Sequence, residues 1–224
     1  ACFVLNSEFA YDLGFLSVVI AVGVSMLCGL LIGLCHVYLK IPSFMASFAF
    51  MYICKGIGMV SYQGHPPTIK DPVITALPTT TFLGIPFITW VAIVMFLLCF
   101  FIQEYTAFGR HIYAVGTNEN IPRSVGVSVE KVKIGVFTLA GFLFGVAGVI
   151  GAIRLGQGQI AIGDDKMFPA QAAVVVGGTS LAGGKGSELG TILGVFTVAI
   201  IENGMNFIGV NAYYQNIVFG IFVL

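Results

Sequence analysis

Long runs of apolar residues alternate with short polar segments along this chain of 224 residues. Four of the runs are long enough to form membrane-spanning helices, because a helix needs about 20 apolar residues to cross the hydrocarbon core of a bilayer. These runs cover residues 15–39, 42–60, 86–102 and 134–153. The pattern therefore predicts an all-α fold, a polytopic integral membrane helical bundle.

Beyond residue 168 the apolar runs become shorter. Residues 169–181 and 191–201 are each shorter than a bilayer is thick, and a glycine-rich segment, 177–186, separates them. Membrane proteins use short or broken helices where irregular backbone lines a pathway and meets water or neighbouring helices. The final run, 216–224, is too short to span, so we expect this chain to be a piece of a longer one.

The polar interruption at residues 103–133 sets the orientation of the other segments. Basic residues gather in cytoplasmic loops, and this segment holds four of the ten Lys and Arg residues, namely Arg110, Arg123, Lys131 and Lys133. We therefore expect it to face the cytoplasm. Segment 61–78 is then a polar connector on the outer side, with its polarity supplied by His65, Lys70 and Asp71.

The composition supports a lipid environment. Hydrophobic residues make up 58% of the chain and charged residues 9%, whereas a soluble domain carries about 25% charged residues. The formal net charge of zero gives no electrostatic basis for binding nucleic acid. Two Gly-x-x-x-Gly pairs, Gly29 with Gly33 and Gly141 with Gly145, are predicted to let neighbouring helices approach closely.

The motifs that could indicate catalysis are incomplete. Residues 179–186 nearly match a phosphate-binding loop, but that loop begins with glycine and ends with serine or threonine, and here Thr179 and Gly186 occupy those positions. The histidines lie on distant segments and the five cysteines lack metal-ligand spacing. The sequence gives no support for an enzyme, a cofactor or a metal site.

Polar residues within the apolar C-terminal part are the candidates for a translocation pathway. An acidic residue at membrane depth is costly and suggests function by default, although Glu202 is also compatible with a position near the outer interface. Pathway lining is predicted for Gly177, Gly178, Thr179, Ser180, Glu202, Asn203 and Asn206. These features alone are compatible with a secondary transporter, a channel, or the membrane part of an ATP-driven transporter.

Three longer motifs distinguish among these classes. They lie at residues 108–134, which begin Phe-Gly-Arg-His-Ile-Tyr-Ala-Val-Gly; at 172–186, which include Gly-Gly-Thr-Ser-Leu-Ala-Gly-Gly-Lys-Gly; and at 202–210, which begin Glu-Asn-Gly-Met-Asn and are followed by Tyr-Tyr-Gln at 213–215. Together they closely resemble the signatures of ABC sugar-importer permeases of the ribose type.

The resemblance implies a role and a set of partners. Residues 1–224 would be a single transmembrane permease domain, truncated at both ends, in the bacterial inner (cytoplasmic) membrane. It would translocate a sugar or similar small polar solute, paired with a second permease subunit as a homo- or heterodimer. Cytoplasmic ABC ATPases would drive it, and an extracytoplasmic sugar-binding protein would deliver the solute. An ion-coupled secondary transporter that uses Glu202 is the alternative.

The resemblance also assigns a cytoplasmic coupling loop at 104–133, with a short coupling helix at about 118–125 that docks onto the ATPase. Gly116 and Gly126 are expected to bracket this helix with turns. Pro122 is tolerated only in a first helical turn, so we expect the helix to start later or to be shorter. The ATPase-coupling residues implied are Asn118, Glu119, Asn120, Ile121, Arg123, Ser124, Val125 and Gly126.

Overall fold

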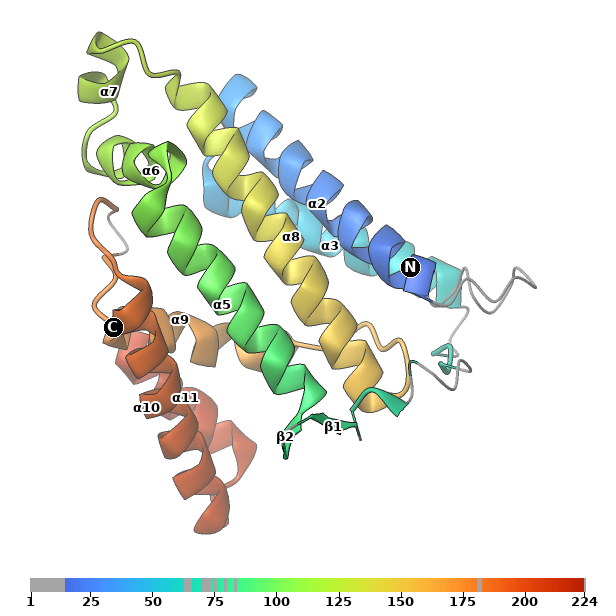
Figure 1. Ribbon diagram of the computed structural model, residues 1–224. Helices are drawn as coiled ribbons and strands as arrows, with labels where there is room; N and C mark the ends of the chain where they lie inside the picture. Colours follow the sequence, from blue (N-terminus) through green and yellow to red (C-terminus); the bar gives the residue numbers. More distant parts are fainter. Residues whose placement is uncertain are drawn as a thin grey trace. The chain divides into compact units, whose positions relative to one another are not determined.

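The computed structural model describes residues 15–62, 66–69, 74, 76–78, 80–82, 84–180 and 183–223 (Figure 1). The long helices are α2 (Phe15–Tyr38), α3 (Ser43–Tyr62), α5 (Phe87–Tyr105), α8 (Val129–Leu155) and α10 (Glu188–Phe207). The shorter helices are α6 (Ala107–Thr117), α7 (Asn120–Ser124), η1 (Asp164–Lys166), α9 (Met167–Val176) and α11 (Ala212–Val223). Strands β1 (Thr81–Phe82) and β2 (Ile85–Pro86) form a small antiparallel pair.

Five helices in the described part of the chain, α2, α3, α5, α8 and α10, are long and apolar enough to cross a membrane. The predicted all-α membrane fold is therefore confirmed. The prediction that residues 191–201 form a segment too short to span is wrong, because α10 has 20 residues. An apolar run ends at the first polar residues, whereas helical backbone hydrogen bonding continues through Asn203 and Asn206.

The polar interruption is also shorter than its sequence suggests. Helix α5 continues to Tyr105, and α8 begins at Val129. Lys131 and Lys133 therefore lie within the first turns of α8. A helix end can carry basic residues at the boundary of a span, because their long side chains reach the interface.

The chain divides into two compact units, and α5 and α8 each contribute residues to both. The first contains Ala1–Met95 and Glu130–Ile162, and the second contains Phe96–Val129 and Gly163–Leu224.

Close backbone contact between α2 and α8 organises the first unit (Figure 1). A Cβ atom on Gly29 would lie 2.9 Å from Cα of Gly141, and one on Gly145 would lie 3.0 Å from Cα of Val22. The Ser25 hydroxyl donates a hydrogen bond of 2.8 Å to the Gly141 carbonyl oxygen across the same contact. Both Gly-x-x-x-Gly pairs thus have the predicted role, and they serve one interface.

The segment after α3 is more than a polar connector. The Ile69 amide donates to the Gly156 carbonyl oxygen at 3.0 Å, and Ile69 and Ile74 are buried against Val149 and Ile153 of α8. The polar residues on which the connector prediction depended, His65, Lys70 and Asp71, lie outside the described residues. The described part of this segment is anchored by apolar side chains.

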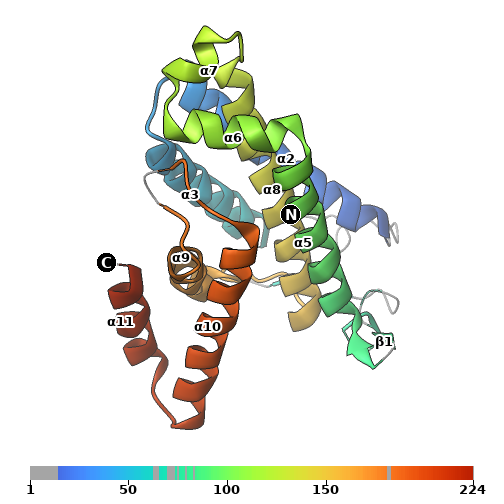
Figure 2. The same cartoon turned by 60° about the vertical axis from the view of Figure 1, so that its left-hand side comes forward.

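Helix α9 is the centre of the second unit and packs against both α10 and α11 (Figure 2). Ala172 and Ala173 of α9 form a buried cluster with Val198 of α10 and Phe219 of α11. Gly194 of α10 lets the two backbones approach closely, since a Cβ on it would lie 3.0 Å from the Ala173 carbonyl carbon of α9. Helix α9, the short helix that the sequence predicted, is thus packed against both α10 and α11.

The α2–α8 contact gives a stability prediction. Gly29→Ala inserts a methyl group against Gly141, and overpacking of this kind costs about 1–3 kcal/mol. Gly23→Ala is a matched control on the same helix, because nothing lies within 4 Å of its added Cβ. We expect the thermal unfolding midpoint of the purified protein in detergent to fall for Gly29→Ala and to change little for Gly23→Ala. Equal midpoints would contradict the α2–α8 contact.

Candidate functional site

The predicted coupling helix exists as α7, one short turn of helix at Asn120–Ser124. Asn118 follows α6, and its side-chain oxygen accepts a hydrogen bond of 2.9 Å from the Asn120 amide. Pro122 is the third residue of α7, in its first turn, where its missing N–H removes no helical hydrogen bond. The expectation of a short helix is therefore confirmed, while its docking role stays a prediction.

The exposed side chains of α7 and of its two flanking residues, Glu119 and Val125, are apolar as well as polar. Ile121 is 62% exposed and Val125 is 75% exposed, and Arg123, Glu119 and Ser124 are exposed beside them. The buried member is Pro122. Its carbonyl oxygen accepts from the amides of Val125, at 3.3 Å, and Val127, at 2.9 Å, and Gly126 adopts the positive φ of 83° that this reversal requires.

Helix α6 turns sharply from the end of α5. Thr106 caps α6, with its hydroxyl oxygen accepting from the Gly109 amide at 3.2 Å, and the same hydroxyl donates to the Ile102 carbonyl oxygen. Gly109 has no room for a side chain, since a Cβ there would lie 2.6 Å from the Ile102 carbonyl oxygen. This corner fixes the direction in which α6 leaves α5.

The last turn of α6 rests on a glycine-rich segment that joins α9 to α10. We call the described residues 177–180 and 183–187 the glycine turn. A Cβ on Gly116 would lie 2.8 Å from the Gly184 amide nitrogen, and one on Gly184 would lie 2.7 Å from Oγ1 of Thr117. The prediction that Gly116 forms a turn beside the coupling helix is wrong, because Gly116 lies within α6. Its missing side chain permits this contact instead.

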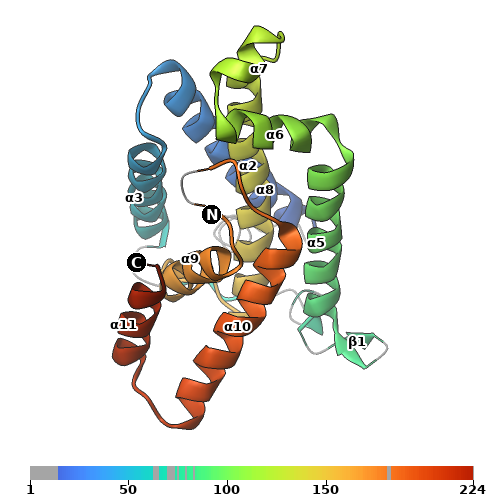
Figure 3. The same ribbon diagram turned by 90° about the vertical axis from the view of Figure 1, so that its left-hand side faces the viewer.

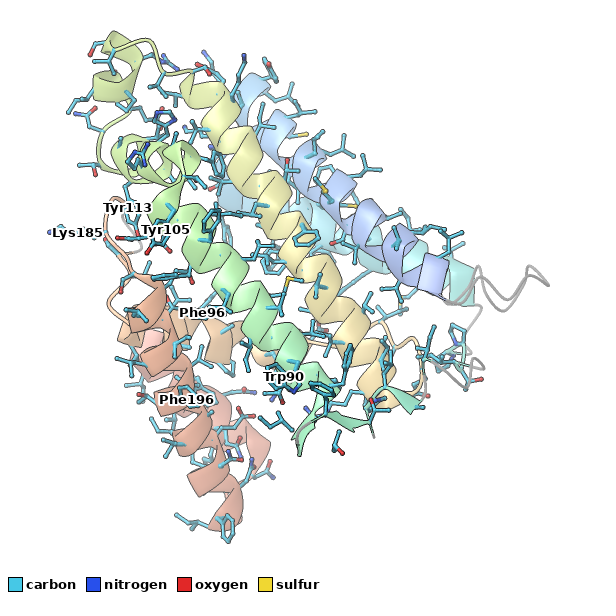
Figure 4. All side chains as sticks on the ribbon, viewed as in Figure 1. Trp90, Phe96, Tyr105, Tyr113, Lys185 and Phe196 are labelled. Atoms are coloured by element: carbon cyan, nitrogen blue, oxygen red, sulfur yellow. The ribbon has the colours of Figure 1, made fainter. Side chains whose placement is uncertain are left out.

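Tyr113 adds a polar link at the same place. Its hydroxyl donates a hydrogen bond of 2.8 Å to the Gly186 carbonyl oxygen and accepts one from the side-chain amide of Gln103 in α5. Figure 4 shows Tyr113 near Lys185 of the turn. Burial, together with the carboxylates of Glu188 and Glu104, raises the pKa of Tyr113 above its ordinary value. A tyrosine phenol is protonated at neutral pH even without such a shift, so it can donate.

The glycine turn has its own hydrogen bonds. The Ser180 amide donates to the Lys185 carbonyl oxygen at 2.9 Å, and the Gly183 amide donates to the Ser180 carbonyl oxygen at 3.1 Å. Ser187 then caps α10 by accepting from the Gly190 amide at 3.0 Å. The amides of Gly177, Gly178 and Thr179 donate instead to carbonyl oxygens of α9, and Thr179 and Ser180 are half-buried.

Glu202 forms an ion pair with Lys166. The Lys166 ammonium lies 2.7 Å from Oε1 of Glu202 and 3.5 Å from Oδ2 of Asp165. The hydrogen bond to Glu202 raises the pKa of Lys166, which burial opposes. The Glu202 side chain is 28% exposed. The charge of Glu202, which lies toward the C-terminal end of α10, is thus balanced by the Lys166 ammonium.

The two asparagines of α10 differ in their surroundings. Oδ1 of Asn206 accepts a hydrogen bond of 2.8 Å from Nε2 of Gln215, which also donates to the Val210 carbonyl oxygen at 3.1 Å. Gln215 is buried, whereas Asn203 is exposed. Asn206 therefore holds the α10–α11 connection, and Asn203 is the one that presents its amide outward.

The predicted pathway residues form two separate groups. Gly177 touches Gly190 and Thr191 near the start of α10, whereas Glu202 lies 12 residues after Gly190, about 18 Å along a helix that rises 1.5 Å per residue. Gly177, Gly178, Thr179 and Ser180 thus lie near one end of α10, with Glu202, Asn203 and Asn206 near the other. Figure 3 shows these ends of the second unit, with α6 and α7 at the first and the α10–α11 connection at the second.

Sequence reasoning missed Tyr113, Gln103 and Lys166. A signal existed for Tyr113, because Tyr113 and Gly116 are three residues apart and so share one face of a helix. The partner of that face, the glycine turn about 70 residues later in the chain, had no signal in local spacing. Among the described residues, no group of three His, Cys, Asp or Glu side chains could hold a metal ion.

These features define a multi-pass helical membrane protein that contains short helices and a structured polar corner. The chain belongs to the family described as the permease component of branched-chain amino acid transport systems, whose model matches residues 2–224. The resemblance to ribose-type permeases is confirmed, because the relatives of this chain include ribose and xylose permeases.

Three relatives illustrate the similarity. The probable ABC transporter permease protein YphD of Escherichia coli strain K12 is 38% identical over 185 residues, 83% of this chain and 56% of the relative. The ribose import permease RbsC of the same strain is 37% identical over 189 residues, 83% of this chain and 59% of the relative. The xylose permease XylH of Haemophilus influenzae is 42% identical over 137 residues, 61% of this chain and 36% of the relative.

The chain thus spans less than two thirds of the length of these relatives. No solved structure shows significant similarity to it.

The contrast between the two asparagines gives a prediction. Asn206→Ala removes an acceptor from buried Gln215, and a lost hydrogen bond of this kind costs about 0.5–1.5 kcal/mol. We expect a lower thermal unfolding midpoint for Asn206→Ala than for Asn203→Ala, measured in the same detergent. A larger loss for Asn203→Ala would show that the bond to Gln215 does not hold the α10–α11 connection.

Proposed function

We propose that this chain is the channel-forming permease subunit of an ABC importer, driven by a separate ATPase that docks on α7. The exposed apolar pair of Ile121 in α7 and Val125, which directly follows α7, carries the proposal. An apolar pair presented by a short helix within a polar segment is what an interface anchor needs, with charged groups such as Arg123 at its rim.

The local structure of α7 suits a docking element. The hydrogen bonds to the Pro122 carbonyl oxygen and the Asn118 side chain hold the helix in one shape before any partner binds. A preformed shape lowers the conformational entropy lost on association. Asn118, Glu119, Asn120, Ser124 and Gly126 would then position Ile121, Arg123 and Val125 for the contact.

The assembly and the solute follow from the family. The named relatives include ribose and xylose permeases, so we infer that a sugar or similar small polar solute is carried across the bacterial inner membrane. A second permease subunit, as a homo- or heterodimer, and an extracytoplasmic sugar-binding protein would complete the transporter. Residues 104–133 would be the cytoplasmic coupling loop of a permease domain that includes residues 1–224.

The mechanism that fits these parts is alternating access. ATP closes the partner ATPases, the coupling helices follow them, and the paired permeases change the side to which they open. Because the binding protein supplies affinity, the pathway needs only hydrogen-bonding and small side chains. Exposed Asn203, with Glu202 and Asn206 nearby in α10, is a candidate at one end, and Gly177, Gly178, Thr179 and Ser180 are candidates at the other.

The geometry at Glu202 weakens the ion-coupled alternative. A carboxylate that binds and releases a proton or sodium ion must exchange partners, whereas this one is held by Lys166 at 2.7 Å. A decisive comparison is solute uptake by the full-length protein alone in liposomes with an ion gradient. Uptake there, abolished by Glu202→Gln, would replace the ABC proposal.

The docking proposal predicts a defined loss of binding. Ile121→Ser combined with Val125→Ser removes the apolar anchors, and an anchor residue typically contributes 2 kcal/mol or more, or about 30-fold in affinity. We expect co-purification of the ATPase with the permease to be largely lost. Ile208→Ser is the control, since Ile208 is 82% exposed but lies at the opposite end of the second unit. Equal ATPase recovery from both variants would contradict docking at α7.

Asn203 gives a separate prediction on the pathway. Asn203→Ala removes an exposed amide without breaking a hydrogen bond within the described structure, so folding and ATPase binding should be retained. We expect slower uptake of radiolabelled ribose by the assembled transporter. Val195→Ala, an exposed apolar residue on the same helix, is the control. Unchanged uptake for Asn203→Ala would remove Asn203 from the pathway.

A further inference from the structure

The junction between α6 and the glycine turn connects the proposed docking helix to the core of the second unit. Helix α7 follows α6 after two residues, and the side-chain oxygen of Asn118 fixes this link by accepting from the Asn120 amide. The Asn118 amide in turn donates to the Ala114 carbonyl oxygen at 3.2 Å. A displacement of α7 is therefore passed directly to the C-terminal end of α6.

The C-terminal end of α6 is in turn seated on the glycine turn. Tyr113, Gly116 and Thr117 share one face of α6, at spacings of three and four residues. Gly116 and Thr117 meet the backbone of Gly183 and Gly184, and Tyr113 donates to Gly186. Gly184 has a φ of 75°, so a side chain there would be strained as well as crowded.

The glycine turn is continuous with the packed helices behind it. Gly177 lies at the end of α9 and contacts Gly190 of α10, where a Cβ on Gly177 would be 2.5 Å from the Gly190 carbonyl oxygen. The buried cluster of Ala172, Val198 and Phe219 then joins α9, α10 and α11. A movement of the turn must therefore be shared by these helices, because close-packed backbones leave no space to absorb it.

The two kinds of contact at the junction act differently. The contact between Gly116 and Gly184 resists compression, but separating two surfaces in van der Waals contact loses only weak attractions. The hydrogen bond from Tyr113 to Gly186 resists separation, because breaking it leaves a half-buried phenol and a carbonyl group unpaired. Gln103 orients the phenol by donating to its oxygen, which directs the hydroxyl hydrogen toward Gly186.

We propose that Tyr113 is a positioning residue for transport, the bond through which α6 pulls the glycine turn when α7 moves. The glycine contacts push the turn in one direction, and the Tyr113 bond returns it in the other. This inference rests on the proposed docking of α7, and it adds the route by which that docking reaches α9, α10 and α11.

A distance measurement in the assembled transporter tests the inference. Spin labels are placed at Lys185→Cys on the turn and at Ser128→Cys, an exposed residue just after Val127, whose amide bonds to Pro122 of α7, in full-length permease whose native cysteines are replaced by alanine. The distance between the two spin labels is compared with and without ATP, in the complex of the permease with its ATPase. We expect the label distance to stay the same on ATP binding in the Tyr113 protein and to change or broaden in Tyr113→Phe.

Transport coupling provides the second readout. In liposomes that contain the ATPase and the binding protein, we expect Tyr113→Phe to keep ATPase binding and ATP hydrolysis while uptake of radiolabelled ribose per ATP falls about three- to tenfold. Gln103→Met, which leaves Tyr113 in place but removes its orienting donor, should shift both readouts in the same direction. Tyr105→Phe is the matched control, because the Tyr105 ring stacks on Phe101 at 5.7 Å and its hydroxyl forms no hydrogen bond within the described residues.

The outcomes separate this inference from the docking proposal. An ATP-dependent change of the label distance with Tyr113 present, or identical distances in Tyr113→Phe and Tyr105→Phe, would overturn the role of Tyr113 while ATPase binding at α7 stands. Loss of the docking proposal has a different signature, since Ile121→Ser with Val125→Ser would then leave ATPase recovery unchanged. If Tyr113→Phe does not fold, the distance in the Tyr113 protein and in Gln103→Met decides.

Discussion

Direct backbone contact between helices, made possible by glycine, is the constraint on which the rest of this structure depends. Helices in lipid gain no hydrophobic free energy by associating, because lipid tails are as apolar as the side chains they replace. Association must come from close packing and from hydrogen bonds between helices. The Gly29–Gly141 contact in the first unit and the Gly177–Gly190 contact in the second supply that packing, and Ser25 adds a hydrogen bond where the backbones meet.

The lipid environment also constrains the backbone that is not helical. Polar groups freed by a break in a helix need partners at membrane depth. The glycine turn finds them within itself, where the Ser180 amide donates to Lys185, and in α9, where the Thr179 amide donates to Val174. One carbonyl of the turn, at Gly186, is bonded to Tyr113 instead. A break in the helix therefore creates both a stable corner and an attachment point, which explains why the segment can be irregular without being loose.

The family membership and the geometry of α7 agree with transport driven from outside the chain. The chain presents apolar side chains on and beside a short, preformed helix, and it places Glu202 of α10 in an ion pair with Lys166. The first feature suits a partner that supplies force, and the second leaves little freedom for a carboxylate that must exchange ions. In the proposed transporter, substrate recognition would require only modest polarity in the pathway, because a separate binding protein would supply the affinity.

The sequence by itself determined the membrane class, the all-α fold and the four early spans, because apolar run length and basic residues act locally. The short helix around Pro122 was expected from the resemblance to a known family. The sequence also identified the residues of both Gly-x-x-x-Gly pairs. Only the tertiary structure decided that these pairs pack against each other. It also decided that Gly116 and Tyr113 contact a turn some 70 residues later in the chain, and that Glu202 forms an ion pair with Lys166. Each of these depends on which surfaces the folded helices bring together, and local spacing carries no record of a partner that is distant in the chain.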